Sequence, residues 1–421
     1  MCPLIMQRVS AMLSLKRQSP SNQFKHSGEV AVMPSSNTLP LEGIRIIDFT
    51  QVMMGPSATQ MLGDFGADVI KIENPKGGDL SRTSFGAVDE KGLNNPVFCS
   101  LNRNKRSLAL DLRQDENKEI VYELIREANV VVSNFRAGVM DRIGFGYEKL
   151  RELNPKLVYA SGSGYGPKGP YSHKGGQDVL AQAMSGVMMR RADSSLPISI
   201  YPTTICDYTT GMHLVQAVLA ALIGVSRTGE GQCVEVSLYD SMIALQMQEA
   251  TCHLNTGKEI NWAEMPLTGV FDTKDGSLVL VGAFKLNPLQ DICNVLGIED
   301  LSIDHPDLET QRANKPYLQE RFQNEFSKQS TAHWMEGLEG ADLLCAPVKE
   351  LAEVLKDPQT EVNGMIESFE HPINGEMQVI ACPIHFSSTD CSARRIPPGL
   401  GEHNDEILAE LGIDRATEAN A

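Results

Sequence analysis

The sequence of 421 residues lacks most of the motifs by which catalytic chemistry is recognised. It contains no P-loop, no CxxC pair and no Ser-His-Asp order. Cys252-His253 and the CPIH run at 382–385 resemble fragments of metal sites, but each lacks a second matching pair of ligands. We therefore predict no metal site, with buried thiols as the simpler reading, and look for the catalytic group among the carboxylates.

Positive charge and long apolar runs are also scarce. The net charge of −17 and the pI near 5.0 argue against nucleic acid as a partner. No uninterrupted apolar run reaches the ~18 residues that a membrane span requires, so no membrane association is predicted. Nine scattered cysteines are typical of reduced thiols and favour a cytoplasmic protein. Residues 1–28 carry basic side chains and serines but no acid, which equally fits a mitochondrial presequence, and thus the matrix, or a disordered bacterial tail.

The hydrophobic pattern predicts two domains, because a single core rarely serves a chain of this length. From residue 41, strand-like and helix-like segments alternate as in a parallel α/β sheet. Near 260–345 a hairpin turn at 274–276 and charged helices predict a smaller α+β domain. We expect a disordered tail or presequence at 1–40, the first part of a large domain at 41–250, a small domain with linkers at 251–350, and a linker with the C-terminal part of the large domain at 351–421.

The most informative segment is ICDYTTGMHL at 205–214, which places Asp207 at the start of a long apolar helix. Asp178 also lies at a predicted helix start, close to a glycine-rich run. A carboxylate at a helix N-terminus can be ionised and can act as a nucleophile. The structural alternative for both residues is a helix N-cap, worth about 1 kcal/mol.

Two loops and several basic side chains suit an anionic ligand. The strand-to-helix junction at 51–56 presents N–H groups of the kind that bind phosphate, although an ordinary turn has the same pattern. The glycine-rich run at 162–170 leads into prolines rather than a helix, so it fails the dinucleotide fingerprint and fits an active-site or surface loop. Basic residues at 102–106, with Arg136 and Arg142, lie at strand ends where α/β proteins bind ligands, or form a solvated face.

Seven motifs occur in the order of one known family. LEGIRIID at 41–48, GDFGADVIKIE at 63–73, NRNKRS at 102–107, NFRAG at 134–138, GYGPKGP at 164–170, GEGQ at 229–232 and GEH at 401–403 resemble the class III CoA-transferases, also called the CaiB/BaiF or formyl-CoA transferase family. The resemblance covers about residues 41–412. It implies a Rossmann-like parallel sheet in a large domain built from both chain ends, a smaller inserted α+β domain, and an interlocked homodimer.

The resemblance also implies a mechanism. The transferases of this family use an Asp in an Asp-x-x-x-Gly context as nucleophile, and Asp207 with Gly211 matches it. Asp207 would attack an acyl-CoA to give an aspartyl anhydride, and the CoA thiolate would return to form an aspartyl-CoA thioester. A carboxylic acid acceptor would then take over the CoA. Coenzyme A is thus a substrate, no cofactor is permanently bound, and Asp178 matches a second active-site acid.

The CoA contacts of the family carry over onto residues of this sequence. They are Val52, Met53, Met54, Leu110, Arg113, Asn134, Phe135, Arg136, Arg142, Lys174, Gly175, Gly176 and Gln177. Three positions depart from the family pattern: Asn74 replaces an arginine that binds the nucleotide phosphates in some members, Ala137 a proline, and Gln177 a tyrosine of the formyl-CoA transferases. The glycine run that covers the active site of those enzymes is absent between 245 and 285, which favours a larger acid, such as a dicarboxylate or a carnitine-like acid.

Two other functions fit the same sequence. The α-methylacyl-CoA racemases share the fold and place a histidine directly before the acid that matches Asp178. Gln177 stands there, and an amide cannot act as a base. A non-catalytic acyl-CoA-binding protein would keep the basic contacts without needing both acids.

Overall fold

A computed structural model describes residues 38–84, 95–192, 195–372 and 375–413. The tail or presequence predicted for residues 1–40 lies outside the described residues, apart from its last three positions. The main sheet, the smaller antiparallel sheet and the C-terminal segment are each described below.

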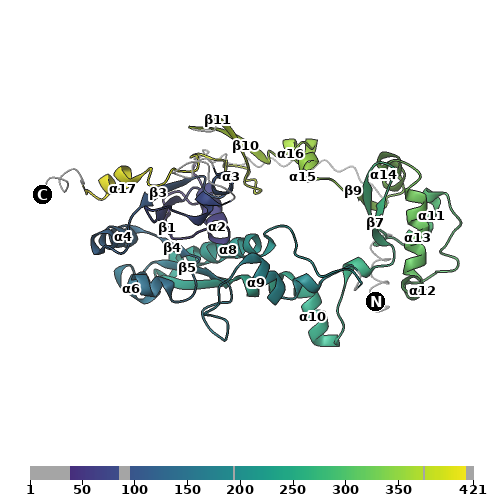
Figure 1. Cartoon of the computed structure of the whole chain (residues 1–421), viewed down its shortest axis with the longest axis horizontal. Helices are drawn as coiled ribbons and strands as arrows, with labels where there is room; N and C mark the ends of the chain where they lie inside the picture. Colours follow the sequence, from purple (N-terminus) through teal and green to yellow (C-terminus); the bar gives the residue numbers. More distant parts are fainter. Residues whose placement is uncertain (1–37, 85–94, 193–194, 373–374, 414–421) are drawn as a thin grey trace, which may run out of the picture. The chain divides into compact units, whose positions relative to one another are not determined.

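Six parallel strands form the main sheet in the order β3-β2-β1-β4-β5-β6 (Figure 1). They are β1 (Arg45–Asp48), β2 (Asp68–Glu73), β3 (Lys105–Ala109), β4 (Val130–Ser133), β5 (Val158–Ser163) and β6 (Gln232–Ser237). The strand order reverses between β1 and β4. In a Rossmann sheet, which has this order, ligands bind outside the carboxyl ends of the strands at the reversal. The prediction of a Rossmann-like parallel sheet is confirmed.

Helices cover both faces of this sheet, because successive strand residues point to opposite sides and both sides are apolar. Ile46 belongs to one core and Ile47 to the other. The first core is closed by α2 (Met54–Asp64), α8 (Ile205–Thr228) and α9 (Leu238–Leu245), and the second by α4 (Asp115–Glu127), α6 (Tyr147–Leu153) and α17 (Asn404–Glu410). Since α17 comes from the far end of the chain, both chain ends contribute to this domain.

Shorter elements connect these helices and strands. They are η1 (Leu80–Thr83), α3 (Pro96–Cys99), α5 (Val139–Ile143), α7 (Asp178–Met184), η2 (Val187–Met189), α10 (Met247–Thr256) and η3 (Trp262–Glu264). The helix predicted from Asp178 to Met188 is shorter than expected, because Gly186 adopts a φ of +86° and breaks the helical path. Helix α8 begins two residues earlier than predicted and continues to Thr228, where Gly229 caps it in the left-handed region.

A second, antiparallel sheet has its own apolar core. Its strands β7 (Thr268–Asp272), β8 (Ser277–Val281) and β9 (Leu344–Pro347) pair in the order β7-β8-β9, with the predicted turn between the first two. The helices α11 (Pro288–Leu296), α12 (Leu308–Ala313), α13 (Lys315–Phe326) and α14 (Thr331–Gly340) accompany it. Phe271, Phe322, Phe326 and Trp334 pack together in the core. This is the smaller α+β unit that the sequence predicts.

The chain then returns to the main sheet through α15 (Leu351–Val354), α16 (Pro358–Val362) and an antiparallel hairpin of β10 (Ile366–His371) and β11 (Gly375–Ile380). Beyond the hairpin, Arg395 O accepts a hydrogen bond from Asn104 N, and His403 N donates to Ser107 O. These contacts attach the C-terminal segment to β3 and to the loop before it.

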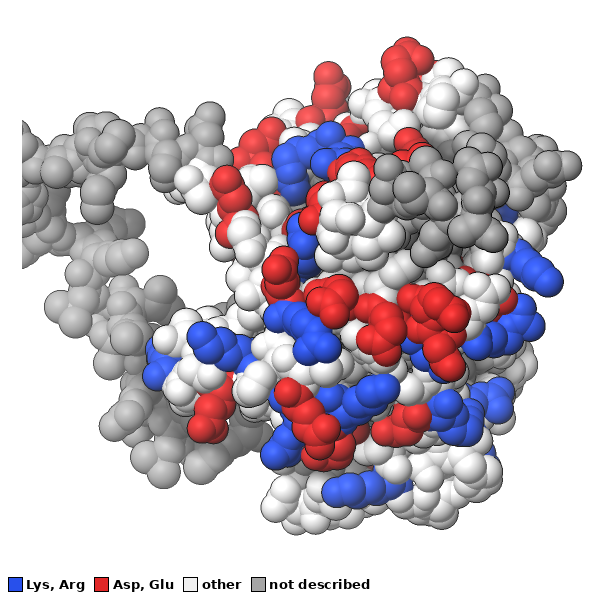
Figure 2. Space-filling view, turned by 90° about the vertical axis from the view of Figure 1, so that its left-hand side faces the viewer, with Lys and Arg blue, Asp and Glu red and all other residues white. Residues whose placement is uncertain are grey.

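The surface charges are mixed on the side that carries α17, α4 and α6. Figure 2 shows acidic and basic side chains interspersed there rather than gathered into one basic field. One helix in the described part of the chain, α8, is long and apolar enough to cross a membrane by length and composition, with a mean hydropathy of 1.5. The absence of long uninterrupted apolar runs did not predict such a helix. Core helices of soluble proteins have the same composition when they are mostly buried; the apolar window of α8 is 33% buried, and α8 packs against α2, β5 and β6.

Candidate active site

Asp207 lies in the first turn of α8, two residues after the helix begins. Its side chain is half-buried, and the neighbouring Cys206 is fully buried. The N-cap position is occupied by Thr204, whose side chain makes no capping bond. The alternative that Asp207 is an ordinary N-cap is therefore wrong.

Asp178 supplies the missing cap from a different helix. Its Oδ2 accepts hydrogen bonds from the N–H groups of Cys206, at 2.8 Å, and Asp207, at 3.0 Å. Its Oδ1 accepts one from Gln182 Nε2 at 2.7 Å. Asp178 is the first residue of α7, so it satisfies orphan donors of α8 rather than of its own helix. The structure thus brings the two predicted acids together at one helix start.

The two carboxylates differ in their freedom to react. Both oxygens of the buried Asp178 are engaged, whereas no donor in the described part of the chain reaches the Asp207 carboxylate. Burial, together with the nearby Asp178 charge, raises the pKa of Asp207 to about 7. A carboxyl group with such a pKa is ionised in a large fraction of molecules near neutral pH. Asp207 is therefore the group that is available for nucleophilic chemistry, and Asp178 is placed to orient it.

The glycine of the Asp-x-x-x-Gly pattern has a steric function. A Cβ atom on Gly211 would lie 2.4 Å from Ser57 Oγ and 2.7 Å from Met54 O. A Cβ atom on Gly162, at the end of β5, would lie 2.6 Å from Met54 Sδ. These two glycines allow α2 and its Met54 to approach α8 closely. Met54, a predicted CoA contact, therefore lies beside Gly211, which is one helical turn after Asp207 in α8.

The turn between β1 and α2 contains Val52 and Met53, also predicted contacts. Val52 is 45% exposed and has a φ of +69°, a left-handed conformation that is unusual for a β-branched residue. Asn134 holds the turn, because its amide accepts from Gln51 N at 2.8 Å and donates to Gln51 O at 2.7 Å. Among the described residues, nothing accepts a hydrogen bond from the N–H of Met53 or Met54. The turn thus offers free donors at a helix start, and Asn134, predicted to contact CoA, supports the turn.

A cavity of about 200 Å³ opens at the carboxyl ends of β1, β2 and β3. Three predicted contacts line it: Leu110, Arg113 and Phe135. Asn74 also lines it, where some family members have an arginine. Arg113 is exposed and pairs with Asp111 at 2.6 Å. The cavity therefore has largely apolar walls, with Glu73 and Asp111 beside the Arg113 cation in its lining.

Of the remaining predicted contacts, Arg136 and the segment 174–177 lie at the end of β5, and Arg142 lies in α5. A Cβ atom on Gly175 would lie 2.5 Å from the Arg136 guanidinium, and one on Gly176 would lie 2.2 Å from Gly164 Cα. The glycines of the segment from Lys174 to Gln177 therefore let it lie against Arg136 and the glycine-rich loop. Arg136 and Arg142 are exposed, and neither has an ion-pair partner within the described ranges. Two unpaired guanidinium groups at this edge suit a phosphate-bearing ligand.

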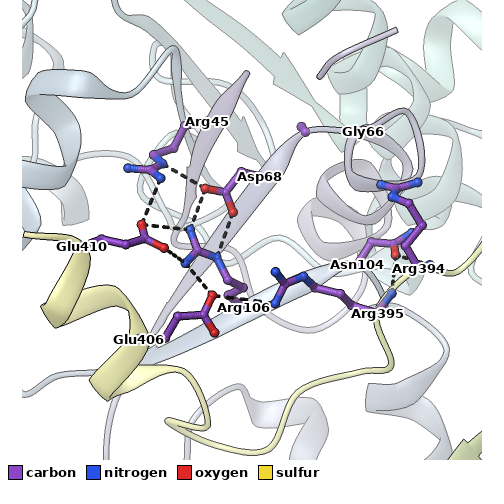
Figure 3. A pocket seen from close by; sticks show the side chains of 10 residues that line it. Arg45, Gly66, Asp68, Asn104, Arg106, Arg394, Arg395, Glu406 and Glu410 are labelled. Atoms are coloured by element: carbon purple, nitrogen blue, oxygen red, sulfur yellow. Dashed lines mark hydrogen bonds and ion pairs between the residues drawn. The ribbon is translucent and has the colours of Figure 1, made fainter. Parts of the chain in front are cut away.

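A cavity of about 340 Å³ lies at the opposite edge of the sheet (Figure 3). Its charged side chains come from the amino ends of the strands and from the C-terminal segment, and they pair with one another. Arg106 contacts Asp68 at 2.6 Å, Glu410 at 2.5 Å and Glu406 at 3.1 Å. None of the predicted CoA contacts lines it, but Asn104 and Arg106 of the basic run 102–106 do. That run forms neither an anion site nor a solvated face, because Arg103, Lys105 and Arg106 are buried and pair with acidic side chains of the same domain. This cavity is part of the attachment of α17, and ligands of such sheets bind at the other edge.

Sequence reasoning missed Gln182 and Asp79 as supporting residues. Gln182 holds Asp178, and Asp79 Oδ1 accepts a hydrogen bond from Val52 N at 3.0 Å. The four-residue spacing from Asp178 to Gln182 signals a shared helix face. A lysine inside the apolar strand segment DVIKIE signals a buried acid nearby, and that acid is Asp79.

The sequence profile of CoA-transferase family III matches residues 41–404. The chain therefore belongs to that family and is an enzyme that transfers CoA, as the motifs predict.

Individual relatives cover nearly the whole chain. The human succinyl-CoA:glutarate CoA-transferase is 33% identical over 385 residues, covering 89% of this chain and 87% of that protein. The succinyl-CoA:mesaconate CoA-transferase of Haloarcula hispanica is 35% identical over 389 residues, with coverages of 90% and 98%. The solved structure of a CAIB/BAIF family protein from Brucella suis matches with a TM-score of 0.79 at 30% identity, over 89% of this chain and 100% of that chain.

Proposed function

We propose that the enzyme moves CoA from an acyl-CoA thioester to a free carboxylic acid through covalent intermediates on Asp207. The observation that carries the proposal is the Asp207 carboxylate at the start of α8, unbonded among the described residues and held beside Asp178.

The proposed reaction needs no hydrolytic base. Asp207 Oδ attacks the thioester carbonyl and expels the CoA thiolate, which leaves a mixed anhydride. The thiolate attacks the aspartyl carbonyl, releases the first acid and forms an aspartyl-CoA thioester. The acceptor carboxylate attacks that thioester, and the thiolate then captures the acyl carbon of the new anhydride and frees Asp207. Water must be excluded throughout, because both anhydrides hydrolyse.

Asp178 fits this sequence as an orienting acid. By accepting the N–H groups of Cys206 and Asp207, it fixes the first turn of α8. Its charge disfavours ionisation of Asp207, so Asp207 returns easily to an acylated, uncharged form. A carboxylate of raised pKa is also a stronger nucleophile than an ordinary one.

The proposed CoA site comprises the turn from Val52 to Met54, the cavity with Leu110, Arg113 and Phe135, and the exposed Arg136 and Arg142 with the segment 174–177. Free N–H groups at a helix start and unpaired guanidinium groups both favour phosphates. The apolar cavity walls suit the adenine ring.

For the acceptor we propose a dicarboxylic acid. The named relatives act on glutarate and mesaconate, both dicarboxylates, and the missing glycine run favours an acid larger than oxalate. A screen with succinyl-CoA as donor should give transfer to dicarboxylates of four or five carbons. Equal turnover with simple monocarboxylates would contradict this assignment.

The covalent step is tested by mass spectrometry of the protein mixed with acyl-CoAs, followed by trapping with hydroxylamine or borohydride. Trapped mass should appear on the Asp207 peptide alone, and Asp207→Asn should abolish it while CoA binding persists. Near-wild-type turnover in Asp207→Asn would refute the mechanism. Solvent deuterium entering the α-carbon of the acyl group, without a labelled Asp207, would instead support racemase chemistry.

We further propose that the active enzyme is a homodimer. Large apolar side chains are exposed along α7, α8, α9 and the intervening segment, and α10 buries none of its residues. Examples are Leu180, Ile198, Tyr208, Ile243 and Met247, each at least 41% exposed. Contiguous apolar surface of this kind marks a protein interface. Light scattering coupled to size-exclusion chromatography should give about twice the 46.1 kDa chain mass, and a monomer would refute the proposal.

A further inference from the structure

A fully buried ion pair lies beneath the turn between β1 and α2. Lys71 Nζ is 2.8 Å from Asp79 Oδ2, and both side chains are 0% exposed. Lys71 comes from within β2, and Asp79 is the N-cap of η1. Removing two charges from water is unfavourable unless further hydrogen bonds satisfy them. The other hydrogen bonds of the two side chains therefore decide whether the pair is satisfied, and they also show which segment the pair supports.

Both members of the pair bond to the turn itself. Lys71 Nζ donates to Thr50 O at 2.7 Å, and Asp79 Oδ1 accepts from Val52 N at 3.0 Å. Asp79 Oδ1 also accepts from the N–H and the hydroxyl of Ser81, each at 2.8 Å. Although burial opposes ionisation, the Lys71 ammonium holds the pKa of Asp79 well below its usual range. Asp79 is therefore charged near neutral pH.

The residue that Asp79 holds is the strained one. Val52 has a φ of +69°, and a β-branched side chain disfavours that region. Such strain persists only where the surroundings over-determine it, and it is concentrated at ligand sites. Without the bond from its N–H, Val52 would return to negative φ and carry Met53 with it.

We propose that Asp79 and Lys71 are positioning residues for CoA binding, which hold Val52 in the left-handed conformation and so present the free N–H groups of Met53 and Met54 to the ligand. This inference rests on the proposed function, in which the turn contacts CoA. Neither residue touches the substrate in this assignment, and both act through the backbone of the turn.

A second buried pair provides a matched control. Asp64 Oδ2 lies 2.7 Å from Arg103, with exposures of 1% and 3%, at the opposite end of α2. It makes no hydrogen bond to the turn. Asp64→Asn thus removes a buried carboxylate of comparable environment without altering the support of Val52.

The experiment compares Asp79→Asn with Asp64→Asn in the full-length enzyme. Asp79→Asn keeps an amide oxygen but replaces the charged acceptor of Val52 N–H by a weaker neutral one and leaves Lys71 without its counter-ion. It should therefore raise the KM for acyl-CoA by about tenfold, while kcat at saturation stays within about twofold. Hydrogen exchange in the peptide spanning 49–56 should accelerate in this variant alone. Asp64→Asn should lower the melting temperature without changing KM. Equal KM values in the two variants, or unchanged exchange in 49–56, would overturn the inference.

Two variants of Val52 keep the test decisive if Asp79→Asn fails to fold. Val52→Pro leaves the buried pair intact but removes the N–H and forbids positive φ, so it should reproduce the tenfold KM increase. Val52→Gly in the Asp79→Asn background should recover most of the affinity, because glycine adopts φ +69° without support. A wild-type KM in Val52→Pro would overturn the inference. Labelling of Asp207 in the wild-type enzyme is measured in the same series, so failure of the proposed function is distinguished from failure of this positioning role; wild-type protein that does not bind CoA would overturn both.

Discussion

Replacing Asp207 by asparagine should make the protein more stable at alkaline pH, although it removes the proposed nucleophile. Burial and the Asp178 charge raise the pKa of Asp207 from 3.8 to about 7. In the unfolded chain the group ionises near its ordinary pKa. The folded state therefore binds the proton more tightly, and the stability contributed by Asp207 is lost as the pH rises from about 4 to about 7. An asparagine does not ionise and escapes this loss.

The magnitude follows from the shift. A rise of about 3 pKa units corresponds to about 4 kcal/mol at pH 8, where the loss is complete. Because Asp207 is only half-buried, solvent screening reduces this to about 2 kcal/mol. At pH 5 the wild-type protein has lost only the first part of the stability that ionisation of Asp207 removes. Asp207→Asn should therefore be more stable than wild type by about 1 kcal/mol or less at that pH.

The assay is thermal or urea unfolding of both proteins at pH 5 and pH 8. Asp207→Asn should unfold at a temperature several degrees higher than wild type at pH 8, with a smaller difference at pH 5. Asp178→Asn is the control, because that carboxylate accepts three hydrogen bonds and its loss should destabilise the protein by about 1–3 kcal/mol. A variant at 207 that is less stable than wild type at pH 8 would refute the reasoning.

The other predictions concern the reaction, the packing of α8, the C-terminal segment and the small domain. The single-turnover rate of Asp207 acylation should increase about fivefold from pH 6 to pH 7, because only the ionised form attacks; a flat profile would exclude the raised pKa. Gly211→Ala should displace α2, since its Cβ would collide with Met54 O. The resulting rise in the activation free energy, measured from kcat, should exceed the loss of unfolding free energy, measured from melting curves. Arg106→Met should destabilise the protein by about 1–3 kcal/mol and speed hydrogen exchange in α17, which exchange mass spectrometry detects. Phe326→Ala should cost about 3–5 kcal/mol in unfolding experiments yet leave the KM for acyl-CoA unchanged in the protein that remains folded.

The sequence predicted the bounds of a helix or strand well where the spacing of its apolar residues and the residues at its two ends indicate the same limits. The apolar pattern predicts strands at 68–73 and 130–133 and a short helix at 147–153, and β2, β4 and α6 have these bounds. The end of α7 was harder to place, because Gly186 breaks the helix inside a segment that remains apolar as far as Met189. The start of α8 was misplaced for a related reason: Thr204 caps the helix without a side-chain bond, and so leaves no local signal.

The sequence was enough to name residues of the candidate site, but it did not predict the hydrogen bonds between them. Asp207 and Asp178 could be named from their positions at helix starts and from the family motif. The hydrogen bond from Asp207 N–H to Asp178 joins residues 29 positions apart, and no local spacing encodes such a contact. Asp79 was missed for the same reason, since Val52 lies 27 positions before it.

The sequence by itself determined the alternation of strands and helices, the small inserted domain, and the nucleophile candidate with its glycine one turn later. These depend on residue period and on the steric size of single residues, which are local properties. Only the tertiary structure decided that Asp178 caps another helix, that Asn134 and Asp79 hold the turn at Val52, and that ion pairs line the cavity at the amino ends of the strands. Those facts arise when the parallel sheet brings residues of distant strands together at its two edges and buries their polar side chains, because a buried charge must find whatever partner the fold places beside it.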